Sequence, residues 1–215
     1  MYLVKTPRLI QNLFPNFKWS IPVEEKKVYL TFDDGPIPEV TPWVLDLLKE
    51  YNFKATFFCV GENALKHPEV LNRIIDEGHT IGNHTFNHLN GWNTENIKYF
   101  HNIRNCAHLI NSKLFRPPYG RIKPKQAQFI QRHYDIIMWT LLSGDFDPLL
   151  SKEMCLENVV SNIHPGSIIV FHDSLKAFEK LKYVLPKTLE NLKLLGFTSD
   201  KIEASKRDHH LVRSA

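Results

Sequence analysis

Long hydrophobic runs are missing from this chain of 215 residues. No segment approaches the roughly 20 consecutive apolar residues that a membrane-spanning helix needs, so we expect no membrane span. Near the N-terminus, the apolar stretch at residues 9–15 is too short and too polar for the core of a secretion signal, and no small-residue cleavage site follows it. On the sequence as given, we therefore expect a cytoplasmic protein.

Cysteine is also scarce. The three cysteines, Cys59, Cys106 and Cys155, lie far apart in the sequence. An odd number without C-x-x-C spacing argues against a disulfide framework and against a thiolate zinc site. Cys59 lies in the apolar run at residues 55–60, so we expect it to be a small buried hydrophobic residue.

Basic runs interleaved with aromatic residues are absent, although the formal net charge is +4. We therefore expect no nucleic-acid partner. Hydrophobic residues make up 43% and charged residues 23%, as in an ordinary soluble globular protein. The chain contains no repeat and no linker. We expect one domain at residues 27–200, preceded by a proline-punctuated lead-in at 1–26 and followed by a disordered tail at 201–215.

Short apolar runs alternate with amphipathic stretches along the domain, which predicts a parallel sheet with crossover helices. About seven such units favour an irregular (β/α) barrel of the α/β class, with a doubly wound open sheet as the alternative. The expected strands are 28–32, 55–60, 79–82, 114–115, 136–142 and 168–171, and the expected helices are 40–51, 68–77, 94–110, 124–133, 156–163 and 178–195.

Polar residues occur at or just after the ends of these expected strands. In a barrel the carboxyl ends of the strands converge on one face, where active sites lie. An open sheet gathers such residues only near a switch point, so their spread along the chain favours the closed form. The residues concerned are Asp33, Asp34, His84, Arg116, Asp145 and His172.

The clearest chemical signals come from two of these strand ends. Asp33 and Asp34 are adjacent carboxylates after an apolar strand, an arrangement that is costly unless a cation neutralises it. His84 and His88 have the i, i+4 spacing that lets two imidazoles point at one ion. One Asp and two His with an open position form a catalytic zinc pattern, which indicates metal-assisted hydrolysis. Taken singly, the Asp-Asp-Gly-Pro stretch is also typical of a turn, and a lone histidine of a solvated surface.

Five stretches in order resemble the motifs of the polysaccharide deacetylase family, carbohydrate esterase family 4, which includes chitin and peptidoglycan deacetylases. The resemblance runs from about Lys27 to Gly196. One such stretch would be weak evidence for the family, but five in order at plausible spacing are specific to it. They are TFDDGP at 31–36, HTFNH at 84–88, RPPYG at 116–120, WTLLSGDF at 139–146 and IVFHD at 169–173.

The resemblance implies a hydrolase that removes N-acetyl groups from N-acetylhexosamine-containing glycans. It implies that Asp34, His84 and His88 hold a divalent metal, with zinc as the expected ion, and that Asp33 is the general base. It further implies that Arg116 clamps the Asp33 carboxylate in a bidentate pair.

The remaining motifs imply the other half of the site. The Tyr119 backbone N–H would face the developing oxyanion, and His172 would protonate the leaving amine while Asp145 orients it. The alternatives are a turn residue for Asp145 and a histidine that caps a strand for His172. The side chains expected to line the substrate site are Pro118, Tyr119, Phe146 and Leu175.

The chain departs from the family pattern in its fourth motif. Leu142 stands where the family has an aspartate, and Phe146 stands where it has a tryptophan. This departure affects the expected shape of the substrate groove, and hence the substrate preference, more than the residues that carry out the chemistry. Cleavage of an O-acetyl ester or a non-sugar amide remains an alternative, as does a catalytically silent glycan-binding module. The full set of Asp33, Asp34 and His172 argues against the silent form. Family members usually act outside the cytoplasmic membrane.

Overall fold

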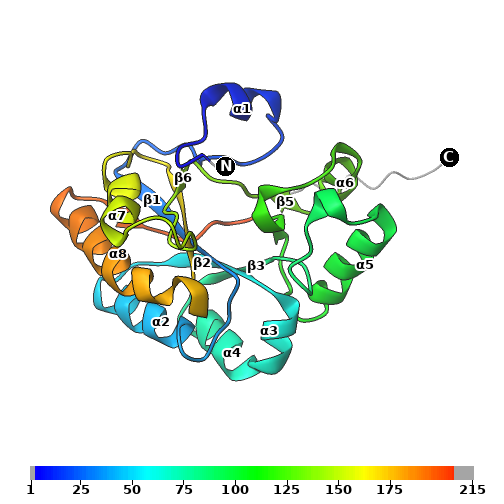
Figure 1. Ribbon diagram of the computed structural model, residues 1–215, viewed down its shortest axis with the longest axis horizontal. Helices are drawn as coiled ribbons and strands as arrows, with labels where there is room; N and C mark the ends of the chain where they lie inside the picture. The colour runs from blue at the N-terminus through cyan, green and yellow to red at the C-terminus, as the bar shows by residue number, and fades with distance from the viewer. Residues whose placement is uncertain (1–2, 206–215) are drawn as a thin grey trace.

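A computed structural model describes residues 3–205 of the protein (Figure 1). Its strands form a curled sheet in the order β5-β4-β3-β2-β1-β7-β6, and β8 pairs with β1 off this path. All of these pairs are parallel, which confirms the expected irregular (β/α) barrel, although the barrel is not closed: β5 and β6 end the strand order at opposite edges, so the sheet is a half-barrel. The strands are β1 (Lys27–Asp33), β2 (Ala55–Cys59), β3 (Thr80–Asn83), β4 (Leu114–Phe115), β5 (Asp135–Ile136), β6 (Leu141–Leu142), β7 (Ile168–His172) and β8 (Thr198–Ser199).

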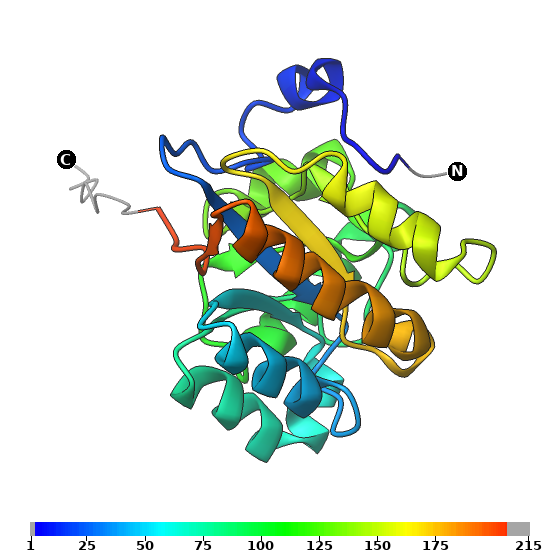
Figure 2. The same ribbon diagram turned by 90° about the vertical axis from the view of Figure 1, so that its left-hand side faces the viewer.

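Helices cover the outer face of the sheet, and Figure 2 shows α7, α8 and α2 side by side on it. The main core lies between these helices and the central strands, where Phe32 stacks on Phe57 and Phe171 at centroid distances of 5.0 and 5.9 Å. The helices are α1 (Arg8–Leu13), α2 (Thr41–Glu50), α3 (Gly61–Lys66), α4 (Pro68–Asp76), α5 (Asn96–Ala107), α6 (Pro124–Ile130), α7 (Lys152–Val160) and α8 (Leu175–Leu194).

The expected strand at 136–142 is broken into β5 and β6, which lie at opposite edges of the sheet. The N-terminal lead-in lies between these edges. The Met138 N–H donates to the Lys18 carbonyl, and the Thr6 N–H donates to the Thr140 carbonyl. This segment therefore uses hydrogen-bonding groups that a continuous strand would have offered to neighbouring strands. The prediction of one strand was wrong because it took no account of the lead-in.

Several element boundaries also differ from expectation. Thr94 was expected to cap the helix that runs to about residue 110, but Glu95 is the cap: its side chain accepts the Lys98 N–H, and the helix begins at Asn96. The helix expected from residue 156 begins at Lys152 after the Ser151 cap. The short elements α1, α3 and β8 were not expected, since pieces this short show no clear periodicity.

The C-terminal residues are only partly described. Residues 201–205, which we expected to belong to a disordered tail, lie against the sheet: Ile202 is 1% exposed and its N–H donates to the Thr56 hydroxyl. The rest of the expected tail, residues 206–215, lies outside the described residues. Within residues 3–205, no helix combines the length and the apolar character needed to cross a membrane. Cys59 is buried in the main core, as expected.

Candidate active site

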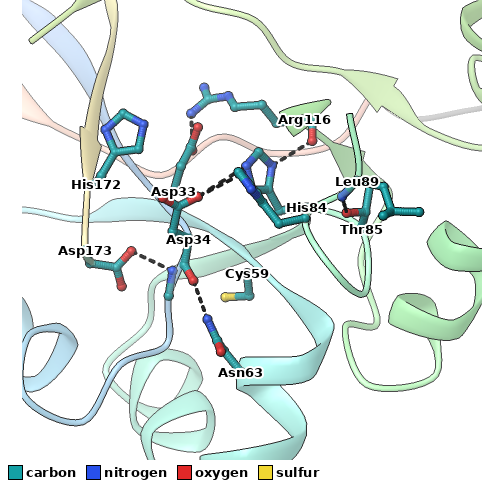
Figure 3. A network of polar contacts seen from close by, with 12 residues as sticks. Asp33, Asp34, Cys59, Asn63, His84, Thr85, Leu89, Arg116, His172 and Asp173 are labelled. Carbon is teal, nitrogen blue, oxygen red and sulfur yellow. Dashed lines mark hydrogen bonds and ion pairs between the residues drawn. The ribbon is translucent and has the colours of Figure 1, made fainter. Parts of the chain in front are cut away.

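The polar residues expected at strand ends meet at the carboxyl end of the half-barrel (Figure 3). Asp33 ends β1 and lies beside His172, which ends β7, because the two residues are direct partners in the register of these strands. His84 follows β3 and Arg116 follows β4. A parallel sheet thus brings together residues that are more than one hundred positions apart in the sequence.

Asp34, His84 and His88 each offer one ligand atom, and these atoms lie within 4.8 Å of one another. Asp34 Oδ1 is 3.1 Å from His88 Nε2 and 3.7 Å from His84 Nε2. Within residues 3–205 this buried oxygen has no hydrogen-bond partner, although both ring nitrogens lie close to it. An unpartnered carboxylate oxygen facing two imidazole nitrogens fits a divalent cation.

The protonation states of these side chains also suit a cation. His84 Nδ1 lies 2.7 Å from the Arg116 carbonyl and must donate to it, which leaves the Nε2 lone pair directed toward Asp34. Burial lowers the pKa of His84 to about 4, against the attraction of Asp33, so the ring is neutral. Burial alone would raise the pKa of Asp34, but the contact with His88 and the other nearby histidines hold it below its usual range. Metal ligands need these deprotonated forms.

The two histidines lie in a loop and not on a helix, so their i, i+4 spacing brings the two imidazoles together without a helical turn. Thr85 and His88 have left-handed backbones, with φ of 63° and 54°. The Asn83 side chain accepts the Thr85 N–H at 2.9 Å, and the Thr85 hydroxyl accepts the Leu89 N–H at 2.9 Å. These side-chain bonds fold the loop so that both imidazoles face one point.

Two asparagines hold this region from the outside. Asn102 on α5 accepts the N–H groups of Phe86 and Asn87, at 2.7 and 3.1 Å. Asn63 on α3 donates to the Asp34 carbonyl at 2.8 Å. Sequence reasoning missed both residues, because a polar residue on a helix gives no signal of the loop that it will contact.

Arg116 is fully buried inside the half-barrel and contacts the Asp33 carboxylate. Its Nη1 donates to Asp33 Oδ1 at 2.7 Å and to the Thr31 hydroxyl at 2.8 Å. The expected bidentate pair is not formed, because Nε and Nη2 donate instead to the carbonyls of Ile137 and Met138. Arg116 therefore fixes one oxygen of Asp33, and the other receives no donor from the described residues.

Asp145 holds His172 at two points. Its carboxylate accepts the His172 backbone N–H and the Nδ1–H, both at 2.8 Å. Burial would lower the pKa of His172, but the Asp145 carboxylate outweighs burial and, with Asp34 and Asp33, raises it to about 9. The imidazole is thus protonated at neutral pH, with Nε2 left to act as an acid.

Tyr119 lies against His88, the second histidine of the pair. Tyr119 follows the buried Pro118 and has a left-handed backbone, with φ of 61°. The Tyr119 ring is 62% exposed and lies 4.7 Å from the His88 ring. Within the described part of the chain the Tyr119 N–H has no acceptor, so it remains available to a substrate.

Phe146 and Leu175, the other expected substrate contacts, flank His172. The Phe146 ring lies 4.9 Å from the His172 ring in an edge-on arrangement. Leu175 begins α8 three residues after His172 and is 62% exposed. Leu142, the other departure in this motif, is buried in β6.

Asp173 is a site residue that sequence reasoning missed. It is 1% exposed, and its carboxylate accepts the Gly35 N–H at 3.0 Å and the Thr41 hydroxyl at 2.6 Å. Burial raises its pKa to about 8, against the hydrogen bonds from Thr41 and Gly35. Asp173 therefore fixes the turn that follows the ligand Asp34. An acidic residue directly after His172 at the end of an apolar strand was the available signal.

The closeness of Gly35 and Asp173 gives a test of this turn. A Cβ at residue 35 would lie 2.0 Å from Asp173 Oδ2, so Gly35→Ala must displace either the turn or the carboxylate. We expect a loss of about 1–3 kcal/mol in the free energy of unfolding together with weaker metal binding. Thermal unfolding and a metal titration measure the two effects.

Gly196→Ala is the matched control, because among residues 3–205 no atom lies within 4 Å of a Cβ at this position, while alanine there must adopt a φ of 75°. It should cost stability through backbone strain and leave metal affinity unchanged. Equal metal affinity in the two variants would contradict the role given to the Gly35 turn.

Comparison with known proteins gives consistent matches. Residues 20–135 match the family described as polysaccharide deacetylase. Two peptidoglycan-N-acetylglucosamine deacetylases of Bacillus cereus are 39% identical over 165 residues and 35% identical over 188 residues. A crystal structure of a peptidoglycan N-acetylglucosamine deacetylase bound to an N-hydroxybenzamide superposes with a TM-score of 0.84 and 34% identity, covering 92% of this chain and 95% of that chain.

The coverage of the two Bacillus cereus relatives differs. The first alignment covers 74% of this chain and 60% of the relative, and the second covers 83% of this chain and 87% of the relative. The chain therefore spans less than two thirds of the first relative and most of the second.

Proposed function

Because the chain belongs to the polysaccharide deacetylase family, we propose that it is a metal-dependent hydrolase that removes N-acetyl groups from N-acetylhexosamine-containing glycans. The observation that carries this function is the unpartnered Asp34 oxygen facing two histidine nitrogens, with Asp33 and the Asp145–His172 pair beside it. The names of the two bacterial relatives favour a peptidoglycan-type glycan over chitin.

Asp34, His84 and His88 would hold the metal, and we propose zinc because two imidazoles and one carboxylate are a common catalytic zinc set. When bound, such an ion polarises the amide carbonyl and lowers the pKa of a water molecule at the site. The donor set is complete without rearrangement of the three side chains, since their ligand atoms already converge.

The chain's own residues supply the proton transfers. Asp33 takes a proton from the attacking water, while the hydrogen bond from Arg116 orients that carboxylate. The Tyr119 N–H donates to the developing oxyanion, and its left-handed backbone holds the donor in place. His172 then protonates the leaving nitrogen, which matters because an amine is a poor leaving group.

Acetate release tests this function against its competitors. We expect release from N-acetylglucosamine oligomers and from peptidoglycan fragments, and little from acetylated xylan or from a simple non-sugar acetamide. Release from xylan alone would indicate an O-acetyl esterase. Release from none of these, with metal bound, would indicate a silent glycan-binding module.

The Asp145→Asn variant tests the role of the acid pair through pH. His172 acts in its protonated form, so activity falls as the pH rises through its pKa. Asp145 is the main influence that raises this pKa, and its removal should lower the pKa and move the high-pH limb of the kcat/KM profile to lower pH. Asp46→Asn, which changes an exposed carboxylate on α2, is the control. A high-pH limb that stays in place would mean that Asp145 is only a turn residue.

A further inference from the structure

An exposed aromatic residue follows the candidate metal ligand His88 in the chain and has no part in the mechanism above. Trp92 is 57% exposed, on a short turn four residues after His88. Its indole N–H donates to the Ile122 carbonyl at 3.2 Å, which fixes the ring in place. The Arg121 guanidinium lies 5.3 Å from the centre of this ring. The pair presents an apolar face and a positive charge together.

The pair belongs to the same surface as the active site. Trp92 is carried by the loop that contains His88, and Arg121 by the loop that contains Tyr119. The two loops touch at both ends, since the His88 and Tyr119 rings lie 4.7 Å apart and a Cβ at Gly91 would lie 2.5 Å from the Arg121 carbonyl. The exposed surface therefore continues from the metal ligand through Tyr119 to Arg121.

The charge of Arg121 is not neutralised by a neighbour. Among residues 3–205, no carboxylate lies within ion-pair distance of its exposed guanidinium. The acidic residues that flank the histidine loop are already engaged, because Glu95 caps α5 and Glu62, which accepts from Asn87, pairs with Lys66. Guanidinium groups bind carboxylates through paired hydrogen bonds, and the C–H face of a sugar ring packs against an indole.

We propose that Trp92 and Arg121 form a subsite for a sugar unit that bears a carboxylate, next to the unit that is deacetylated. This subsite would make the enzyme prefer acidic glycans, such as peptidoglycan strands freed of their stem peptides, in which alternate sugars carry a free lactyl carboxylate, over neutral ones. The inference rests on the proposed function for its substrate class.

The test uses two matched substrates with the full chain loaded with zinc. One is a peptidoglycan-derived oligosaccharide without stem peptides, and the other is the same oligosaccharide after its carboxylates have been reduced to alcohols. We expect Arg121→Gln to lower kcat/KM on the acidic oligosaccharide by about 10-fold, mainly through KM, and to leave the reduced one unchanged. Trp92→Ala should weaken the binding of both substrates and so raise KM for each. Arg132→Gln, which removes another exposed arginine after α6, should change neither.

Equal effects of Arg121→Gln on the two substrates, or no effect on either, would overturn the subsite. If the wild-type protein releases acetate from neither, the proposed function fails, and binding measured by tryptophan fluorescence decides the inference. Weaker binding of only the acidic oligosaccharide by Arg121→Gln then supports it. Equal binding by wild type and variant contradicts it.

Discussion

Replacing Asp33 with asparagine should lower acetate release by about 10²–10⁴-fold and leave the metal content of the protein unchanged. Asp33 is not one of the three converging ligands, so its charge is not needed to hold the ion. The amide oxygen of asparagine can still accept the Arg116 Nη1–H that now meets Asp33 Oδ1 at 2.7 Å. The substitution therefore removes the base while keeping the buried guanidinium partnered.

Asp34→Asn is the matched control, because it makes the same replacement of a carboxylate by an amide at the neighbouring residue. It removes the charge from the oxygen that faces both histidines, so metal affinity should fall together with activity. Metal analysis of the purified variants and acetate release with saturating zinc separate the two effects. If Asp33→Asn lost the metal and Asp34→Asn retained it, the two roles would be exchanged.

The double variant His84→Ala, His88→Ala should lose the bound metal and, with it, all measurable deacetylation. Removing two of three protein ligands leaves a single carboxylate, which holds a divalent ion weakly. The wild-type melting temperature should rise with added zinc, since a ligand that binds only the native state stabilises it, and the double variant should show no such rise. This readout does not depend on any substrate.

His101→Ala provides the control for the histidine pair, because His101 is exposed on α5 and lies outside the converging set. It should keep both the metal and the zinc-dependent rise in melting temperature. His84→Ala alone will also cost stability, since the Arg116 carbonyl loses its buried donor. Full metal occupancy in the double variant would refute the assignment of the site.

The central part of the fold was predictable from the sequence because its elements carry strong local signals. The strands β1, β2 and β7 are short runs of apolar residues, and the polar pair Asp33–Asp34 marks where β1 ends. The carboxyl ends of parallel strands meet at one edge, so the position of the site followed from the strand assignments.

The details that escaped prediction depend on contacts between segments distant in sequence. The break between β5 and β6 depends on Lys18 and Thr6, more than one hundred residues earlier. The shape of the histidine loop depends on Asn102 and on left-handed residues, which no periodicity reveals. The single contact between Arg116 and Asp33 follows from carbonyl groups that become available only because β5 and β6 are separated.

Arg116 makes the active site dependent on the integrity of the irregular edge of the sheet. Its guanidinium donates to Ile137 and Met138 on one side and to Asp33 on the other, while its own carbonyl orients His84. Local opening of the segment after β5 would therefore misplace the base and a metal ligand together, even with the main aromatic core intact. Activity can therefore be lost without global unfolding, because local opening of the segment after β5 is sufficient while the main aromatic core stays folded.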